Sequence, residues 1–166
     1  VRHVTRPGMA LSVAGLRRPD PPADLEIRVV RSRADWSGYV DVQVDAFDLD
    51  PAIAAGFPPY SVVGGSRMQL LVGAVDGVVT CAAAIFRTGA DAGVFAVGTL
   101  ASHRGRGHGS AITAAAVDVA GAMGAGTVAL QSSADGLGVY RALGFAEIGS
   151  WVVWMDPAVE RARAGA

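Results

Sequence analysis

The chain has 166 residues, of which 51% are hydrophobic and 17% are charged, so it can bury a sizeable core as one domain of ordinary size. Its formal net charge of −1 at pH 7 provides no overall field for nucleic acid or for an anionic membrane, and we expect neither partner. All 14 basic residues are arginine, which excludes every mechanism that needs a lysine. The single cysteine, Cys81, permits no intramolecular disulfide and argues against a zinc cluster, which favours a reducing, cytoplasmic location and no metal.

The first 24 residues end in a proline-rich stretch, RRPDPPA, which breaks any regular element. Charge before the apolar residues 9–16 is typical of a signal peptide, but no small-residue cleavage pattern follows, and a strand or an ordered arm explains them better. We therefore interpret residues 1–24 as an N-terminal arm or linker. The domain itself is expected over residues 25–156, with a C-terminal tail over residues 157–166.

Apolar and charged side chains alternate over residues 25–30, which predicts a half-buried strand. Over residues 34–48 the apolar positions recur every three or four residues, as in an amphipathic helix, which Asp50-Pro51 ends. The segment from Pro51 to Ser66 is rich in proline, glycine and aromatic residues. We expect it to be a loop that covers the substrate side of a site.

Two strands are predicted over residues 68–75 and 78–86, joined at Asp76-Gly77, which is a strong hairpin signal. The run from Gly93 to Ala101 is apolar throughout, as in a strand that helices cover on both faces. Gly98 interrupts this run. A glycine inside a strand marks a bulge or a place where another molecule approaches the backbone.

A loop rich in glycine and arginine follows that strand and leads into a helix. Three glycines at alternate positions allow positive φ and close approach of a ligand, and the first N–H groups of the helix lack internal partners. A phosphate satisfies these donors and the positive end of the helix dipole. The glycines are Gly105, Gly107 and Gly109, and they alternate with Arg104, Arg106 and His108.

The C-terminal third reads as helix, strand, helix and a terminal hairpin. These elements are expected over residues 110–123, 127–131, 135–143, and 145–148 with 151–155. A strand, helix, strand order implies a parallel pair at the centre of the sheet. Phe145, Trp151 and Trp154 are expected in the core of the sheet, and Cys81 is expected to be a small buried hydrophobic residue.

The spacing of the glycines separates three kinds of phosphate loop. A P-loop needs a lysine, which the chain lacks, and the dinucleotide fingerprint G-x-G-x-x-G does not fit glycines spaced as G-x-G-x-G. The pattern [RQ]-x-x-G-x-[GA] fits Arg104, Gly107 and Gly109 without gaps.

With this motif the chain resembles the GCN5-related N-acetyltransferase (GNAT) superfamily, in which the loop binds the pyrophosphate of acetyl-CoA. A second signature agrees, because the stretch LQSSADGLGVYRALGF from Leu130 to Phe145 carries Tyr140 on a helix that ends in Leu-Gly-Phe. The resemblance covers roughly residues 25–156. It implies an α/β fold with a mixed, mostly antiparallel central sheet that is splayed at its middle strands and has helices on both faces.

The resemblance also implies an acetyl-CoA-dependent N-acetyltransferase whose acceptor is a primary amine of a small molecule or of a peptide or protein. Tyr140 would be the general acid, because a phenol with a pKa of about 10 stays protonated at neutral pH and can donate to a thiolate. His103 is expected to face solvent. The residues implied in cofactor binding are Gly98, Thr99, Leu100, Arg104, Gly105, Arg106, Gly107, His108, Gly109, Ser110 and Ser133.

The chain departs from the family in the residue that would act as the general base. Many relatives carry a glutamate on the central strand, but residues 92–101 contain no ionisable side chain. Asp45, Asp48 and Asp50 either contact the substrate or are solvated surface acids. A further alternative is that the substrate amine arrives in its neutral form and needs no base. The missing carboxylate also leaves a non-catalytic acyl-CoA-binding or regulatory module as an alternative, and a homodimer is left open.

Overall fold

The computed structural model describes residues 2–50, 56–57, 60, 65 and 67–155. One seven-stranded sheet runs through these residues in the order β2-β3-β4-β5-β6-β1-β7. The strands are β1 (Arg2–Ser12), β2 (Glu26–Val29), β3 (Met68–Val75), β4 (Val78–Thr88), β5 (Asp91–Thr99), β6 (Thr127–Gln131) and β7 (Ala146–Met155), and the α-helices are α1 (Arg33–Ala46), α3 (His108–Ala122) and α4 (Leu137–Ala142).

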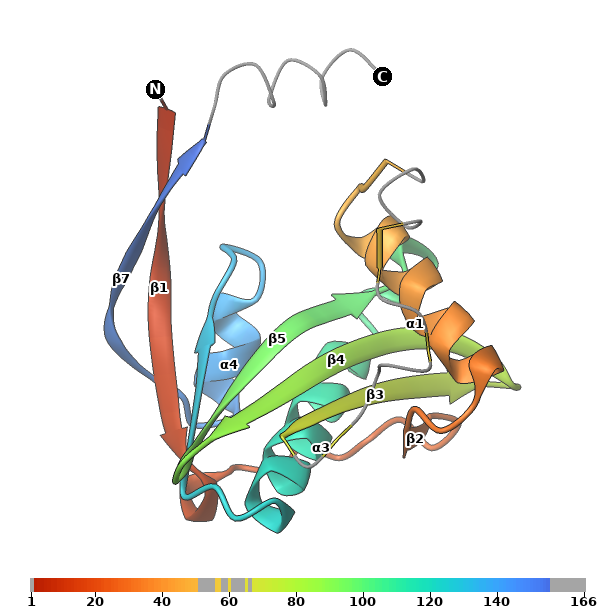
Figure 1. Ribbon diagram of the computed structural model, residues 1–166, viewed down its shortest axis with the longest axis horizontal. Coiled ribbons are helices and arrows are strands. Elements are labelled where there is room, and N and C mark those ends of the chain that lie inside the picture. Colours follow the sequence, from red (N-terminus) through yellow and green to blue (C-terminus); the bar gives the residue numbers. More distant parts are fainter. Residues whose placement is uncertain (1, 51–55, 58–59, 61–64, 66, 156–166) are drawn as a thin grey trace.

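The sheet is antiparallel except for β5 and β6, which are parallel, as the strand, helix, strand order predicts. These two strands pair only where they begin, between residues 91–93 and residues 127–129. Beyond that point they diverge: β5 runs beside β4 toward α1, whereas β6 runs alongside β1 toward α4 (Figure 1). The predicted α/β class and the splayed, mostly antiparallel sheet are therefore confirmed.

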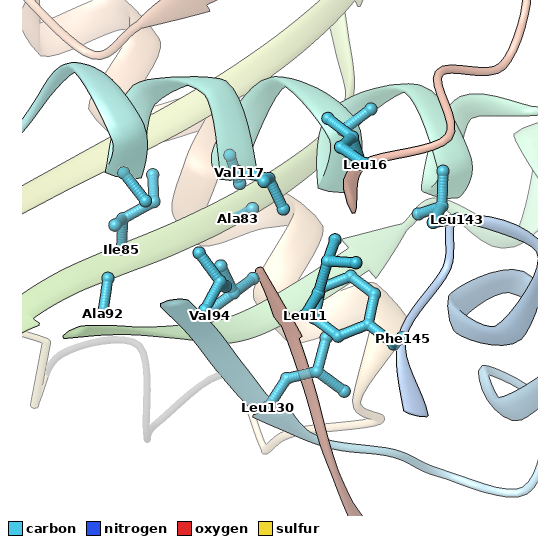
Figure 2. Packing of buried hydrophobic residues seen from close by; sticks show 14 of the residues in the cluster. Leu11, Leu16, Ala83, Ile85, Ala92, Val94, Val117, Leu130, Leu143 and Phe145 are labelled. Atoms are coloured by element: carbon cyan, nitrogen blue, oxygen red, sulfur yellow. The ribbon is translucent and has the colours of Figure 1, made fainter. Parts of the chain in front are cut away.

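Helices cover both faces of the sheet, because α3 packs on one face of β3, β4 and β5 and α1 packs on the other. The larger core lies under α3 and includes the fully buried Ile112 and Ala116. Figure 2 shows Val117 of the same helix above the strand residues Ile85 and Val94. Cys81 belongs to this core and is fully buried, as predicted, and burial raises the pKa of its thiol to about 11. Apolar burial on both faces fixes the position of β4 and β5, and the end of β5 forms part of the cavity wall described below.

Local signals set the ends of the elements around the site. Ser32 caps α1 by accepting a hydrogen bond from the backbone N–H of Asp35 at 3.0 Å. Asp76 and Gly77 both have positive φ, 50° and 80°, which is the geometry of the tight hairpin turn expected there. Gly107 begins α3 with a φ of 85°, so the glycine-rich loop leads directly into the helix.

The N-terminal segment is not an arm outside the sheet, which corrects the interpretation of residues 1–24. Residues 2–12 form β1, which lies between β6 and β7 and is antiparallel to both. Pro7 is compatible with this strand because its carbonyl accepts from Ser132 N at 2.9 Å, so its nitrogen faces the same edge. At that edge β6 has just ended at Gln131, and no strand acceptor there needs a proline N–H.

The predicted terminal hairpin is also wrong, because residues 146–155 form one continuous strand, β7, that pairs with β1. Gly149 does not turn the chain. It lies opposite Gly8 at a bulge, and the Trp151 indole crosses so close to Gly8 that an added Cβ would lie 2.9 Å from its Nε1. Phe145 is buried as expected, but Trp151 and Trp154 lie on the edge strand and are 56% and 66% exposed.

Candidate active site

A cavity of about 680 Å³ opens where β5 and β6 diverge, between the start of α3 and α4. Most of the residues implied in cofactor binding line it together with Tyr140, although they come from three separate stretches of the chain. Leu100 and Arg106 do not line it. The implied residues on its wall are Gly98, Thr99, Arg104, Gly105, Gly107, His108, Gly109, Ser110, Ser133 and Tyr140.

The glycine-rich loop presents a row of backbone donors to this cavity. Gly105 and Gly107 have φ values of 75° and 85°, which only glycine adopts without strain. Among the described residues, none accepts a hydrogen bond from the N–H groups of residues 105–109. An added Cβ at Gly105 would meet open space. Unpaired donors at a helix start fit a phosphate group, so the residues present are compatible with a CoA pyrophosphate.

His108 contributes its backbone rather than a charged side chain. Its imidazole is buried beneath the loop, where Nδ1 lies 3.0 Å from the hydroxyl of Thr80 on β4. Burial lowers the pKa of His108, and the neighbouring His103 lowers it further, against an opposing effect of Asp24. Burial thus favours the neutral form of the ring, and the contact with Thr80 joins the start of α3 to β4.

Arg104 spans the loop, β5 and α1. Its guanidinium donates to the carbonyl oxygens of Thr99 at 3.3 Å and of Ala46 at 3.4 Å. Guanidinium groups carry five N–H donors, so further donors remain for an anion. His103, which we expected to face solvent, lies on the cavity wall with its ring 5.7 Å from that of His108.

The end of β5 has one edge that no strand of the described residues occupies. Leu100 N donates to Thr80 O at 2.9 Å, so this N–H is committed to β4 and is not free for a ligand. Successive residues of a strand turn their N–H groups to opposite edges, so the N–H of Thr99 faces the open side where β6 has diverged. Thr99 also lines the cavity, which makes it the donor of this segment that can meet a ligand.

Gly98 lies against α1, and this contact yields a prediction. An added Cβ would lie 2.9 Å from Ala46 Cβ and 3.3 Å from Val42 Cγ1. We expect Gly98→Ala to lower the melting temperature by about 2 to 12 °C in calorimetry, because overpacking costs about 1 to 3 kcal/mol. Gly138→Ala is the control: its Cβ would meet open space in α4, so that variant is expected to be as stable as the wild type or more stable.

Tyr140 is 8% exposed, and burial raises the pKa of its phenol. Its ring packs edge-on against Phe145 at 5.9 Å, which fixes its direction, and its hydroxyl has no hydrogen-bond partner among the described residues. Nearby, Ser133 Oγ accepts from Gly136 N at 3.1 Å and so starts the turn that leads into α4. A protonated phenol therefore stands on the cavity wall at neutral pH.

The candidate acids do not supply a carboxylate on the cavity wall near β5. Asp45 accepts a hydrogen bond from Ala101 N at 2.7 Å, so its carboxylate ties α1 to the chain after β5. Asp48 follows α1 with a positive φ of 48°. Most of the predicted substrate loop, Pro51 to Ser66, lies outside the described residues, so its role stays a prediction.

Sequence reasoning missed several residues of the wall. Arg6 reaches it from β1, a segment in which no sequence motif points to a site. Phe47 and Val97 belong to predicted elements but carry no motif. Asp135, Gly136 and Val139 fall inside the Leu130 to Phe145 stretch, and helical spacing of four residues from Tyr140 points to Gly136 but not to Val139, its direct neighbour.

The sequence profile of the acetyltransferase (GNAT) family matches residues 41–145, which include both the glycine-rich loop and the Tyr140 stretch. This chain belongs to the GNAT family. Membership of this family supports acyl transfer in general. No protein with a curated description matches the chain.

Solved structures agree with this GNAT assignment. A GCN5-related N-acetyltransferase from Kribbella flavida is 29% identical, with a TM-score of 0.72 over 90% of this chain and 56% of its own. A GCN5-related N-acetyltransferase from Sphaerobacter thermophilus is 19% identical, with a TM-score of 0.70 over 89% of this chain and 50% of its own. An acetyltransferase from Trypanosoma brucei, 20% identical, has a TM-score of 0.64 over 80% of this chain and 99% of its own. The chain thus spans only about half the length of the first two proteins.

Within the described part of this GNAT chain, no helix is both long enough and apolar enough to cross a membrane.

Proposed function

We propose that this chain is an acetyl-CoA-dependent N-acetyltransferase that moves an acetyl group to a primary amine by direct attack. The proposal is supported by one observation above all: a single cavity is lined both by the unpaired N–H groups after Arg104 and by the protonated Tyr140. The first feature suits the pyrophosphate of a CoA, and the second suits a departing thiolate. The acceptor is an amine of a small molecule or of a peptide or protein.

Each part of the wall has a chemical task in this proposal. Acetyl-CoA, when bound, supplies the acetyl thioester. The N–H groups of residues 105–109 and the spare donors of Arg104 hold the phosphates. The N–H of Thr99 donates to the carbonyl oxygen and polarises it. Tyr140 donates its proton to the departing thiolate. Before that step the phenol stays protonated, because burial raises its pKa further above that of a thiol.

The amine must lose a proton, and the part of β5 that lines the cavity, residues 97–99, offers no base for it. Residues 92–101 contain no ionisable side chain. Asp45 is engaged by Ala101 N and is therefore a poor candidate. We propose that the acceptor amine binds in its neutral form, and that the proton its nitrogen loses after the attack replaces the one that Tyr140 gives to the departing thiolate.

Thermal unfolding with acetyl-CoA, CoA, ATP or NAD present tests the choice of ligand. At a hundred times its dissociation constant, a ligand adds about 2.7 kcal/mol, which raises the melting temperature of a domain of this size by about 5 to 11 °C. We expect such a rise with acetyl-CoA and with CoA. A rise with NAD alone would contradict the proposal.

A non-catalytic acyl-CoA-binding or regulatory module is the second candidate, and the absence of a carboxylate from residues 92–101 favours it. Such a module would show the same thermal shifts with CoA but would turn over no amine. The Tyr140 variant described in the Discussion separates the two candidates.

A further inference from the structure

A bulge in β5 lies between the parallel start of this strand and its cavity edge. The pairing with β4 jumps from Ala84 opposite Phe95 to Ala82 opposite Gly98. Ala96 and Val97 therefore stand opposite Ala83 alone, and Ala96 has a φ of 52°, which is strained for a residue other than glycine. A strained bulge persists only where its surroundings hold it.

The end of α1 holds this bulge through three polar contacts, which we call the α1 anchor. Gln43 Nε2 donates to Ala96 O at 2.9 Å, Asp45 Oδ2 accepts from Ala101 N at 2.7 Å, and Ala46 O accepts from Arg104 at 3.4 Å. Gln43 is 3% exposed, so its carboxamide has little access to water. The α1 anchor is thus hydrogen-bonded to the segment 96–104 at its start, middle and end.

The anchor acts on the part of β5 that faces the cavity. Thr99 lies between the two residues that Gln43 and Asp45 hold, and Gly98 touches Val42 and Ala46 of the same helix. A helix is stiff along its axis, so fixing both points to α1 leaves the Thr99 N–H little freedom to turn.

We propose that Gln43 is a positioning residue, whose buried carboxamide fixes the β5 bulge and thereby the direction of the Thr99 N–H toward the acyl carbonyl. The inference rests on the proposed function for the identity of that carbonyl. Gln43 itself does not line the cavity. Its effect is therefore expected on carbonyl polarisation and turnover rather than on the phosphates.

The test uses Gln43→Leu, which keeps the volume of the side chain but removes the donor. We expect kcat to fall by about tenfold or more, because the polarising N–H is misplaced. CoA affinity should change by less than about threefold, because the loop after Arg104 still holds the phosphates. The probe is acetyl-CoA labelled with ¹³C at the thioester carbonyl. Its infrared stretch should move to lower wavenumber on binding wild type and move clearly less on binding the variant.

Two further variants separate positioning from loss of stability. Ser32→Ala weakens the same helix at its other end, where Ser32 caps it, and should leave both kcat and the infrared band as in the wild type. Gln43→Glu can donate to Ala96 O only when its carboxyl is protonated, and burial raises the pKa of a carboxyl. Its infrared shift should therefore recover as the pH falls, while that of Gln43→Leu stays constant.

Each outcome decides the matter. The inference would be overturned by any of three results. The carbonyl band of Gln43→Leu could equal that of the wild type, Ser32→Ala could lose as much of the shift and of kcat as Gln43→Leu, or the band of Gln43→Glu could stay constant with pH. Wild type that binds acetyl-CoA without any carbonyl shift contradicts the inference but leaves the proposed function standing. Wild type that binds neither acetyl-CoA nor CoA contradicts both.

Discussion

Tyr140→Phe is expected to lower kcat for acetylation of amines by about 10²-fold or more, which corresponds to about 2.7 kcal/mol of activation free energy. The substitution removes only the hydroxyl, so the packing of the ring against Phe145 is kept. CoA affinity is expected to stay near that of the wild type, because the unpaired loop donors are untouched. Steady-state kinetics on a panel of amines, with CoA titrated by calorimetry, measures both quantities.

The pH dependence gives a second signature for Tyr140. Burial raises the pKa of its phenol, so the protonated form persists above the ordinary value of about 10. The wild-type rate should therefore not decline through loss of this proton as the pH rises from neutrality to about 10.

Tyr39→Phe is the matched control. Tyr39 is also a buried helix tyrosine, with its pKa raised to about 12 by burial, but it does not line the cavity. It should keep wild-type turnover. If Tyr140→Phe also keeps it, Tyr140 is not the general acid, and if wild type binds CoA but acetylates no amine, the chain is a binding module.

Gly107→Glu is expected to weaken CoA binding by at least about a hundredfold, because it places a carboxylate beside the donors that would hold the pyrophosphate. Gly107 has a φ of 85°, so any side chain there also adds backbone strain of about 1 to 3 kcal/mol. The protein should still fold, with a melting temperature lower by about 2 to 12 °C. Calorimetric titration and thermal unfolding of the ligand-free variant measure these effects.

Gly107→Gln separates charge from strain. It has the same length and the same backbone cost but no charge, so it should lower the melting temperature as much as Gly107→Glu. CoA affinity should fall clearly less in the glutamine variant. Full CoA affinity in Gly107→Glu would show that this loop serves another purpose.

Elements with local signals could be predicted from the sequence. The three α-helices, the Asp76-Gly77 hairpin and the parallel pair around α3 are present, because apolar periodicity, turn residues and chain order are all local. The loop motif and the Tyr140 stretch likewise predicted that the chain belongs to the GNAT family. Both depend on residues that are close together in the chain.

The failures concern pairing between distant segments. Pro7 and Gly8 are both unfavourable inside a strand. Pro7 is tolerated because β6 ends beside it, and Gly8 is required because the indole of Trp151 occupies the space of a side chain. Gly149 followed by Ser150 is typical of a turn, yet Gly149 pairs with Gly8 in the middle of β7. Arg6 reaches the cavity for the same reason, so this part of the wall could not be predicted.

The place of β1 also bears on how the chain folds. Its partners are the last two strands, since Ser12 pairs with Thr127 and Ala10 pairs with Ala146. During synthesis β1 leaves the ribosome before the other strands of this sheet, but its two partner strands are made only after β2, β3, β4 and β5. Such distant pairing slows folding and leaves an unpaired strand exposed in the meantime. We therefore infer that the half of the cavity carrying Arg6 is completed last, after the half built by β5 and α3.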